Sequence, residues 1–303
     1  MYSFDSRSDT VATDEPLYAN HLITNDHLER PYKDQLLASQ PYASNTKEQL
    51  DILQTPKGSN YTFFKHMGKH FPLLNLSLSS AVESPANFLL QKQHKHIILV
   101  RDPLKVLMSW ENAVKSGNAA VCSLEEIGLP DLVSAYETLT TSSVAATSNN
   151  VVVVDSDALL IKPEKTLKSL CALLEILFDP AMLSWEKGPK KCDGIWAPWW
   201  YKNAHESTSF SAPAANQYRT LPPALLPLFR NCLPFYEVLR AKVISDVDFK
   251  IPYEDPRNAN VMCYIGQPGN GSIVPREMAR ISPFDSAVQG GDAAWEGLRI
   301  YRG

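Results

Sequence analysis

The chain has 303 residues, of which 44% are hydrophobic and 20% are charged, and its formal net charge is −4. These values are typical of a globular protein that is long enough for one large domain or two ordinary ones. The negative net charge argues against broad nucleic-acid binding, although a local basic pocket is compatible with it.

Neither a membrane span nor a secretory signal is predicted. The longest apolar runs, residues 97–100 and 151–154, are far too short to cross a bilayer, and the N-terminus lacks a basic region followed by an apolar core. The five cysteines form no Cys-x-x-Cys pair, which favours reduced thiols over disulfides or a zinc site. We therefore expect a cytoplasmic protein with no membrane, nucleic-acid or metal partner. A plastid transit peptide upstream of Met1 and a homo-oligomer are alternatives that the sequence leaves open.

The first fifty residues are polar and favour helices, with turn signals at residues 14–16 and 30–31. A short β-type run follows at Tyr61 to Phe64 and ends at Lys65 and His66. This part of the chain therefore predicts helices and then one short strand.

Two apolar runs, His96–Val100 and Val151–Val154, have the continuous β-branched character of strands that are buried on both faces. Pro103 opens a helix after the first run, and Pro163 opens an amphipathic helix that continues through Leu177 after the second. The strand–helix–strand–helix order predicts an α/β fold, in which a parallel sheet is flanked by helices.

The pattern changes toward the C-terminus. Residues 221–243 are predicted to form a last helix pair, divided by Pro227 and Pro234, and a polar stretch follows. Residues 261–274 then have the pattern of a small β-hairpin. We therefore predict an α/β domain at residues 1–245, a linker at 246–257 and a partial second domain at 258–303.

Arg101 and Ser109 form the strongest candidate site in the sequence. Ligands of open α/β sheets bind beyond the carboxyl ends of the strands, which is where Arg101 is expected. Its guanidinium suits a phosphate or carboxylate, and Ser109, about two turns into the helix, could bracket the same phosphate. The alternative is that the arginine pairs with a nearby carboxylate and the serine is buried on its helix.

The segment from Arg101 to Trp110 resembles the sulfotransferase segment that holds the 3′-phosphate of 3′-phosphoadenosine 5′-phosphosulfate (PAPS). The resemblance continues, in the same order, through residues 151–160, 163–171 and 178–189. It implies a P-loop, sulfotransferase-like fold over residues 1–245. It also implies PAPS as sulfuryl donor, with Arg101 and Ser109 on its nucleotide phosphate.

Lys65 and His66, directly after a strand, resemble the Lys/His pair of the same family. The resemblance implies that Lys65 contacts the phosphosulfate and that His66 is the base for a small-molecule acceptor. His66 and His70 could instead be ordinary histidines at a helix start, or an i,i+4 metal pair for which no third ligand is evident.

The resemblance also has a gap. Sulfotransferases begin with a strand and a phosphate loop that cradles the 5′-phosphosulfate. Residues 1–4 resemble the helix just after that loop, so we expect this domain to lack the loop and the central strand, and to be inactive as given.

Residues 193–202 resemble a narrower subgroup, in which the sulfotransferase-like domain precedes a branched-chain aminotransferase-like domain. This segment is rich in aromatic residues, which either line an acceptor pocket or pack a loop against the core. They are Trp196, Trp199, Trp200 and Tyr201.

Residues 281–301 resemble the opening of class IV aminotransferases, which depend on pyridoxal phosphate (PLP). By this resemblance Trp295, Gly297 and Arg299 border a substrate pocket, whereas the alternative is a glycine-hinged strand with a surface arginine. The lysine that anchors PLP lies farther downstream in that family, so PLP is expected only in a longer parent protein. Two alternatives to a sulfotransferase thus stay open: an aminotransferase-like protein of which this is the N-terminal part, and a non-catalytic binding module.

Overall fold

A computed structural model describes residues 1–40, 43–53, 58–75, 94–115, 122–141, 150–211, 221–244, 262–267 and 270–275. The chain divides into two compact units, Met1–Asp248 and Phe249–Gly303. No helix in the described ranges combines the length and the apolar character needed to cross a membrane. The cysteines that these ranges describe with their side chains are unpaired: Cys122, Cys171, Cys192 and Cys232.

One parallel strand pair lies near the N-terminus. β1 (Thr10–Asp14) pairs with β2 (Tyr61–Lys65), and the register sets Asp14 opposite Lys65 at the carboxyl ends of the two strands. The prediction of helices alone over the first fifty residues is wrong here, because β1 interrupts them. Alternate residues of β1 are buried, but they are two polar residues and one alanine, which do not form the apolar stripe that identifies a strand in a sequence.

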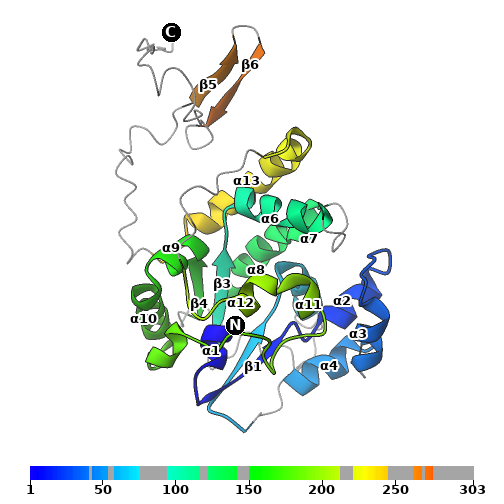
Figure 1. Ribbon diagram of the computed structural model, residues 1–303, viewed down its shortest axis with the longest axis vertical. Coiled ribbons are helices and arrows are strands. Elements are labelled where there is room, and N and C mark those ends of the chain that lie inside the picture. The colour runs from blue at the N-terminus through cyan, green and yellow to red at the C-terminus, as the bar shows by residue number, and fades with distance from the viewer. Residues whose placement is uncertain are drawn as a thin grey trace. The chain divides into compact units, whose positions relative to one another are not determined.

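A second parallel pair joins β3 (His96–Val100) to β4 (Val151–Asp155). Both strands and their parallel pairing confirm the predicted α/β class (Figure 1). Residues 152–154 are at most 3% exposed, as expected for a strand covered on both faces. Arg101, the first residue after β3, therefore emerges at the carboxyl end of this pair.

Helices surround the two strand pairs (Figure 1). The α-helices are α1 (Tyr2–Asp5), α2 (Tyr18–Thr24), α3 (Lys33–Ser39), α4 (Thr46–Leu53), α5 (Phe71–Asn75), α6 (Pro103–Lys115), α7 (Leu124–Ile127), α8 (Leu129–Thr141), α9 (Ser156–Ile161), α10 (Pro163–Leu174), α11 (Ala197–Trp200), α12 (Lys202–Glu206) and α13 (Leu226–Arg240). The 3₁₀ helices are η1 (Gly68–His70), η4 (Pro180–Leu183) and η5 (Pro223–Leu225).

Two helical segments differ from the prediction. α10 begins at Pro163, as expected, but it stops at Leu174 because Glu175 adopts a left-handed conformation with φ of 60°. The predicted helix pair at residues 221–243 is mainly a single helix, α13, which a short 3₁₀ turn precedes. Pro227 lies in its first turn, where no backbone N–H partner is lost, and Pro234 is accommodated inside it.

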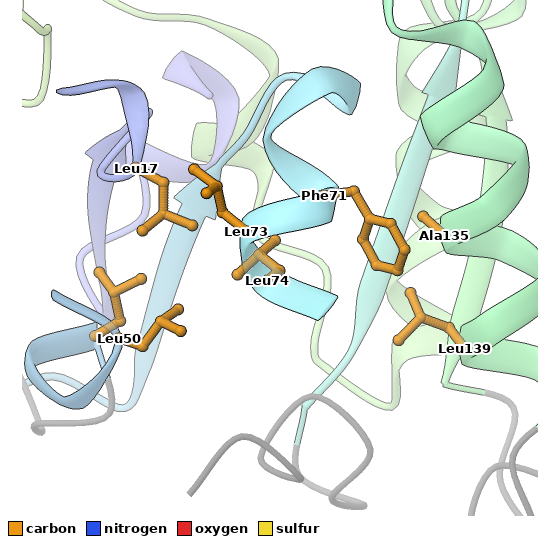
Figure 2. Close-up of a cluster of buried hydrophobic side chains, with 8 residues drawn as sticks. Leu17, Leu50, Phe71, Leu73, Leu74, Ala135 and Leu139 are labelled. Carbon is orange, nitrogen blue, oxygen red and sulfur yellow. The ribbon is translucent and has the colours of Figure 1, made fainter. Parts of the chain in front are cut away.

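A cluster of buried apolar side chains fixes the segment that follows β2 (Figure 2). Phe71 of α5 points toward Ala135 and Leu139 of α8, whereas Leu73 and Leu74 of α5 lie on the side of α4. The cluster consists of Leu17, Leu50, Leu53, Phe71, Leu73, Leu74, Ala135 and Leu139. Because η1 ends where α5 begins, burying α5 also fixes the positions of Lys69 and His70.

The backbone of η1 packs closely on the junction between α7 and α8. A Cβ added to Gly68 would lie 2.4 Å from the carbonyl oxygen of Gly128, and Gly128 itself has φ of +70°. Both positions therefore require glycine, one for space and one for conformation.

The second unit contains a β-hairpin, as predicted. β5 (Met262–Gln267) pairs antiparallel with β6 (Asn270–Pro275), and Gln267 lies opposite Asn270. The strands are longer and the connection shorter than the sequence indicates. The predicted aminotransferase residues Trp295, Gly297 and Arg299 lie outside the described residues.

Candidate functional site

Arg101 and Ser109 are both exposed at the carboxyl end of β3 and on α6. Within the described ranges, neither side chain makes a hydrogen bond or ion pair. Asp102 caps the start of α6 by accepting from the backbone N–H of Leu104 at 2.8 Å. Neither alternative reading is therefore observed: no described carboxylate neutralises Arg101, and the serine is not buried.

Lys105, the next cation on α6, is already paired. Its Nζ lies 2.6 Å from Oδ2 of Asp157, which links α6 to α9. Asp155, the last residue of β4, caps α9 by accepting from the backbone N–H groups of Asp157 at 2.7 Å and Ala158 at 3.0 Å. Of the two cations described here, Arg101 and Lys105, Arg101 is the one without a described ion pair.

Lys65 occupies a different environment at the carboxyl end of β2. Its ammonium group donates to Oε1 of Glu15 and to the hydroxyl of Tyr201, at 2.5 Å, and lies 3.1 Å from Oδ1 of Asp14. Burial disfavours the charge, but Glu15, Tyr201 and Asp14 outweigh it and raise the pKa of Lys65 above its ordinary value. The ammonium thus makes two hydrogen bonds, to Glu15 and Tyr201, and an ion pair with Asp14.

Glu15 is the most constrained member of this cluster. It has φ of 39°, a left-handed conformation that is uncommon for a residue with a side chain, and its backbone N–H donates to the carbonyl oxygen of Lys65 at 2.8 Å. Only 7% of its side chain is exposed, and Oε2 lies 3.9 Å from Nε2 of His70. Backbone strain of this kind is frequent at functional sites.

Two histidines follow Lys65: His70 is buried, and His66 is partly buried. Nδ1 of His66 and both ring nitrogens of His70 are buried without a hydrogen-bond partner. Burial, with Lys65 and His96, lowers the pKa of His66 to about 4, and burial lowers that of His70 well below its ordinary value. Both rings are therefore neutral at pH 7, so each has a lone pair that can accept a proton.

A second buried charge cluster lies beside His70. Oε2 of Glu126 accepts from Arg30 and, at 3.1 Å, from Nζ of Lys69. The hydroxyl groups of Tyr18 and Tyr32 are 2.9 Å apart, and Arg30 donates to that of Tyr18 at 3.2 Å. No group of three or more metal-binding side chains occurs in the described ranges.

The aromatic segment mainly packs against the core. Trp196 is 3% exposed and lies edge-on to Tyr18, at 5.0 Å between ring centroids, while Nε1 of Trp200 donates to the hydroxyl of Tyr32 at 2.8 Å. Tyr201 differs, because its hydroxyl reaches Asp14 as well as Lys65. All four aromatic residues thus pack in or against the core, and Tyr201 in addition joins the Lys65 cluster.

Sequence reasoning missed the residues that surround Lys65. Asp14 and Glu15 were noted only as part of a turn, because the strand before them was not recognised. Two consecutive acidic residues at the end of a strand are the signal that could have identified them. Tyr201 had no comparable signal, since 136 residues separate it from Lys65.

Comparisons with known proteins identify one family and two long relatives. Residues 1–243 match the family described as "Sulfotransferase domain". Two Arabidopsis thaliana proteins, branched-chain-amino-acid aminotransferase-like proteins 2 and 1, are 41% and 40% identical to this chain over its whole length. The chain spans about half the length of these curated relatives, 50% of each.

Among solved structures, the sulfotransferase from Alicyclobacillus acidocaldarius aligns with 80% of this chain and 90% of its own, at 9% identity and a TM-score of 0.46. The family assignment itself rests on the match that covers the first unit almost completely. This chain belongs to the sulfotransferase domain family.

Proposed function

We propose that residues 1–245 bind a sulfonucleotide of the PAPS type, with Arg101 and Ser109 on its 3′-phosphate. The observation that carries the proposal is that Arg101 is exposed at the carboxyl end of β3 and has no ion pair in the described ranges. A guanidinium in that position offers paired donors to a phosphate, and the hydroxyl of Ser109 offers one more. The family match supports a nucleotide sulfonate donor.

The proposed reaction is transfer of the sulfuryl group to a small-molecule acceptor. The acceptor oxygen forms a bond to sulfur, the bond between sulfur and the nucleotide phosphate oxygen breaks, and the acceptor proton passes to a base. His66 is the proposed base, because its ring is neutral and Nδ1 has no partner. His70 shares both properties, and Oε2 of Glu15 lies near it.

Lys65 is the proposed contact to the phosphosulfate. Its ammonium already donates to Glu15 and Tyr201 and pairs with Asp14, so in this role we expect it to exchange one of those partners for the donor. Arg101 needs no such exchange, and the 3′-phosphate is therefore the part of the donor that the described residues accommodate best.

Calorimetric titration with 3′-phosphoadenosine 5′-phosphate (PAP) tests the nucleotide site. Arg101→Ala is expected to weaken PAP binding by at least about tenfold, since a charge-assisted pair is worth about 1.5–3 kcal/mol. Arg230→Ala is the matched control, because Arg230 is exposed on α13 and has no ion pair in the described ranges. Equal binding by wild type and Arg101→Ala would refute the proposal.

A second function is favoured by the relatives' names and by the hairpin in residues 262–275. In this proposal the chain is the first part of an aminotransferase-like protein, with Trp295, Gly297 and Arg299 near a substrate pocket. Absorbance of bound PLP, measured on a longer parent protein purified with and without added PLP, tests it. Absence of a PLP chromophore from the longer protein would count against it and leave a sulfotransferase or a binding module.

A further inference from the structure

Residues 193–206, which include α11 and α12 (Figure 1), form a strap that hydrogen bonds connect to Asp14 and Lys65 at the carboxyl ends of β1 and β2. The backbone N–H of Gly194 donates to Oδ2 of Asp14 at 3.1 Å, and the hydroxyl of Tyr201 donates to the same oxygen at 2.8 Å. Two separate points of the strap therefore bind one buried carboxylate on β1.

The ends of the strap are fastened to each other. Nε2 of His205 lies 2.9 Å from Oδ2 of Asp193, and Oδ1 of Asp193 accepts from the hydroxyl of Tyr2 at 2.8 Å. These contacts involve neither Lys65 nor Arg101. The closure at His205 can therefore be removed without altering either proposed nucleotide contact.

Tyr201 is the partner of Lys65 that is easiest to replace. Asp14 ends β1 and Glu15 follows it, and their carboxylates are buried, with 0% and 7% of the side chains exposed, whereas Tyr201 offers a neutral hydroxyl from the strap. The Lys65 side chain is 27% exposed, so solvent reaches part of it. A hydrogen bond from an ammonium to an anionic oxygen is stronger than one to a neutral hydroxyl.

We propose that the strap is an autoinhibitory contact, in which the hydroxyl of Tyr201 and the 5′-phosphosulfate end of the donor compete for Lys65. This inference rests on the proposed function and adds a regulatory step to the same site. Binding the 5′ end of the nucleotide breaks the contact between Lys65 and Tyr201, while Asp14 and Glu15 stay in place. The 3′ end binds at Arg101 and is independent of the strap.

The two ends of the nucleotide can be tested separately with PAP and with adenosine 3′-monophosphate, which lacks the 5′ group. Tyr201→Phe keeps the ring but removes the competing hydroxyl, and we expect PAP to bind about fivefold more tightly to it than to wild type. Its affinity for adenosine 3′-monophosphate is expected to stay unchanged. His205→Ala, which removes the contact between His205 and Asp193, is expected to tighten PAP binding by a smaller factor.

Tyr236→Phe is the matched control, because the Tyr236 hydroxyl has no hydrogen bond in the described ranges. The strap inference is overturned if Arg101→Ala weakens both nucleotides as expected but Tyr201→Phe and His205→Ala bind PAP no more tightly than wild type. The proposed function fails instead if Arg101→Ala matches wild type with both nucleotides. If neither wild type nor any variant binds either nucleotide, both proposals fail. Thermal melting of each variant confirms that it is folded at the temperature of the titration.

Discussion

Each of the two strand pairs has a cation at its carboxyl end, and the two cations differ in exposure and in ion pairing. Arg101, after β3, is exposed and makes no ion pair in the described ranges, whereas Lys65, at the end of β2, is held by two carboxylates and a hydroxyl. Arg101 can bind a ligand without losing a described partner, whereas Lys65 must exchange a partner to contact one. The comparison therefore separates the proposed 3′-phosphate contact from a charge cluster that stabilises the fold until the 5′ end of the donor binds.

The largest expected effect comes from removing Lys65. Lys65→Met leaves Asp14 and Glu15 buried without their cation, and loss of one partner of a buried ion pair costs about 3–5 kcal/mol. Urea unfolding measures the free energy directly. Lys168→Met is the control, since its pair with Glu164 is more than half exposed and is expected to contribute little. Equal effects of the two variants would show that Lys65 does not stabilise the fold.

Acid should lower the free energy of unfolding through the histidines near β1 and β2. Burial lowers the pKa of His21 and of His66 to about 4, whereas an unfolded histidine titrates near 6.5. The contribution of these histidines to the free energy of unfolding is therefore complete above pH 6.5. It falls as the pH drops from 6.5 toward 4, because only the unfolded chain takes up these protons. The expected loss at pH 5 is about 2 kcal/mol for each histidine.

Urea unfolding of His66→Gln at pH 7 and pH 5 checks this expectation. The variant should lose less stability between the two pH values than wild type does, because one of the proton-binding groups is gone. His27→Gln, at an exposed position, is the control. An unchanged pH dependence in His66→Gln would mean that this imidazole titrates normally in the folded protein.

Asp155 offers an effect of intermediate size at the end of β4. Asp155→Ala removes the side chain that caps α9, which is expected to cost about 1 kcal/mol. Asp155→Asn keeps an oxygen acceptor and should retain most of that stability. Chemical unfolding of the two variants distinguishes capping from a charge requirement, because the second variant would be equally damaged if the charge itself were needed.

The smallest expected effect on stability comes from Arg101→Ala, within about 0.5 kcal/mol, because Arg101 has no ion pair to lose in the described ranges. The same variant is expected to lose PAP affinity, so its thermal melting and its titration should disagree. A large drop in melting temperature would place Arg101 in the fold and erase the contrast with Lys65.

The sequence predicted one strand pair well and the other poorly. Residues 97–100 and 151–154 are continuous apolar runs typical of buried strands, and their parallel pairing followed from the order of elements. The prediction that both strands are buried on both faces is wrong for β3, where Leu99 is 51% exposed. β1 escaped recognition, because its buried positions are mostly polar. Without β1, the acidic residues at its end could not be placed beside Lys65.

The sequence by itself determined the α/β class, the position of Arg101 after a buried strand and the hairpin near the C-terminus, because each depends on neighbours in the chain. Only the tertiary structure decided that Lys65 is paired, that Arg101 is free of ion pairs in the described ranges, and that Tyr201 closes the Lys65 cluster. Ion pairs here join residues from distant segments of the chain, and local sequence patterns do not show which distant side chains come into contact.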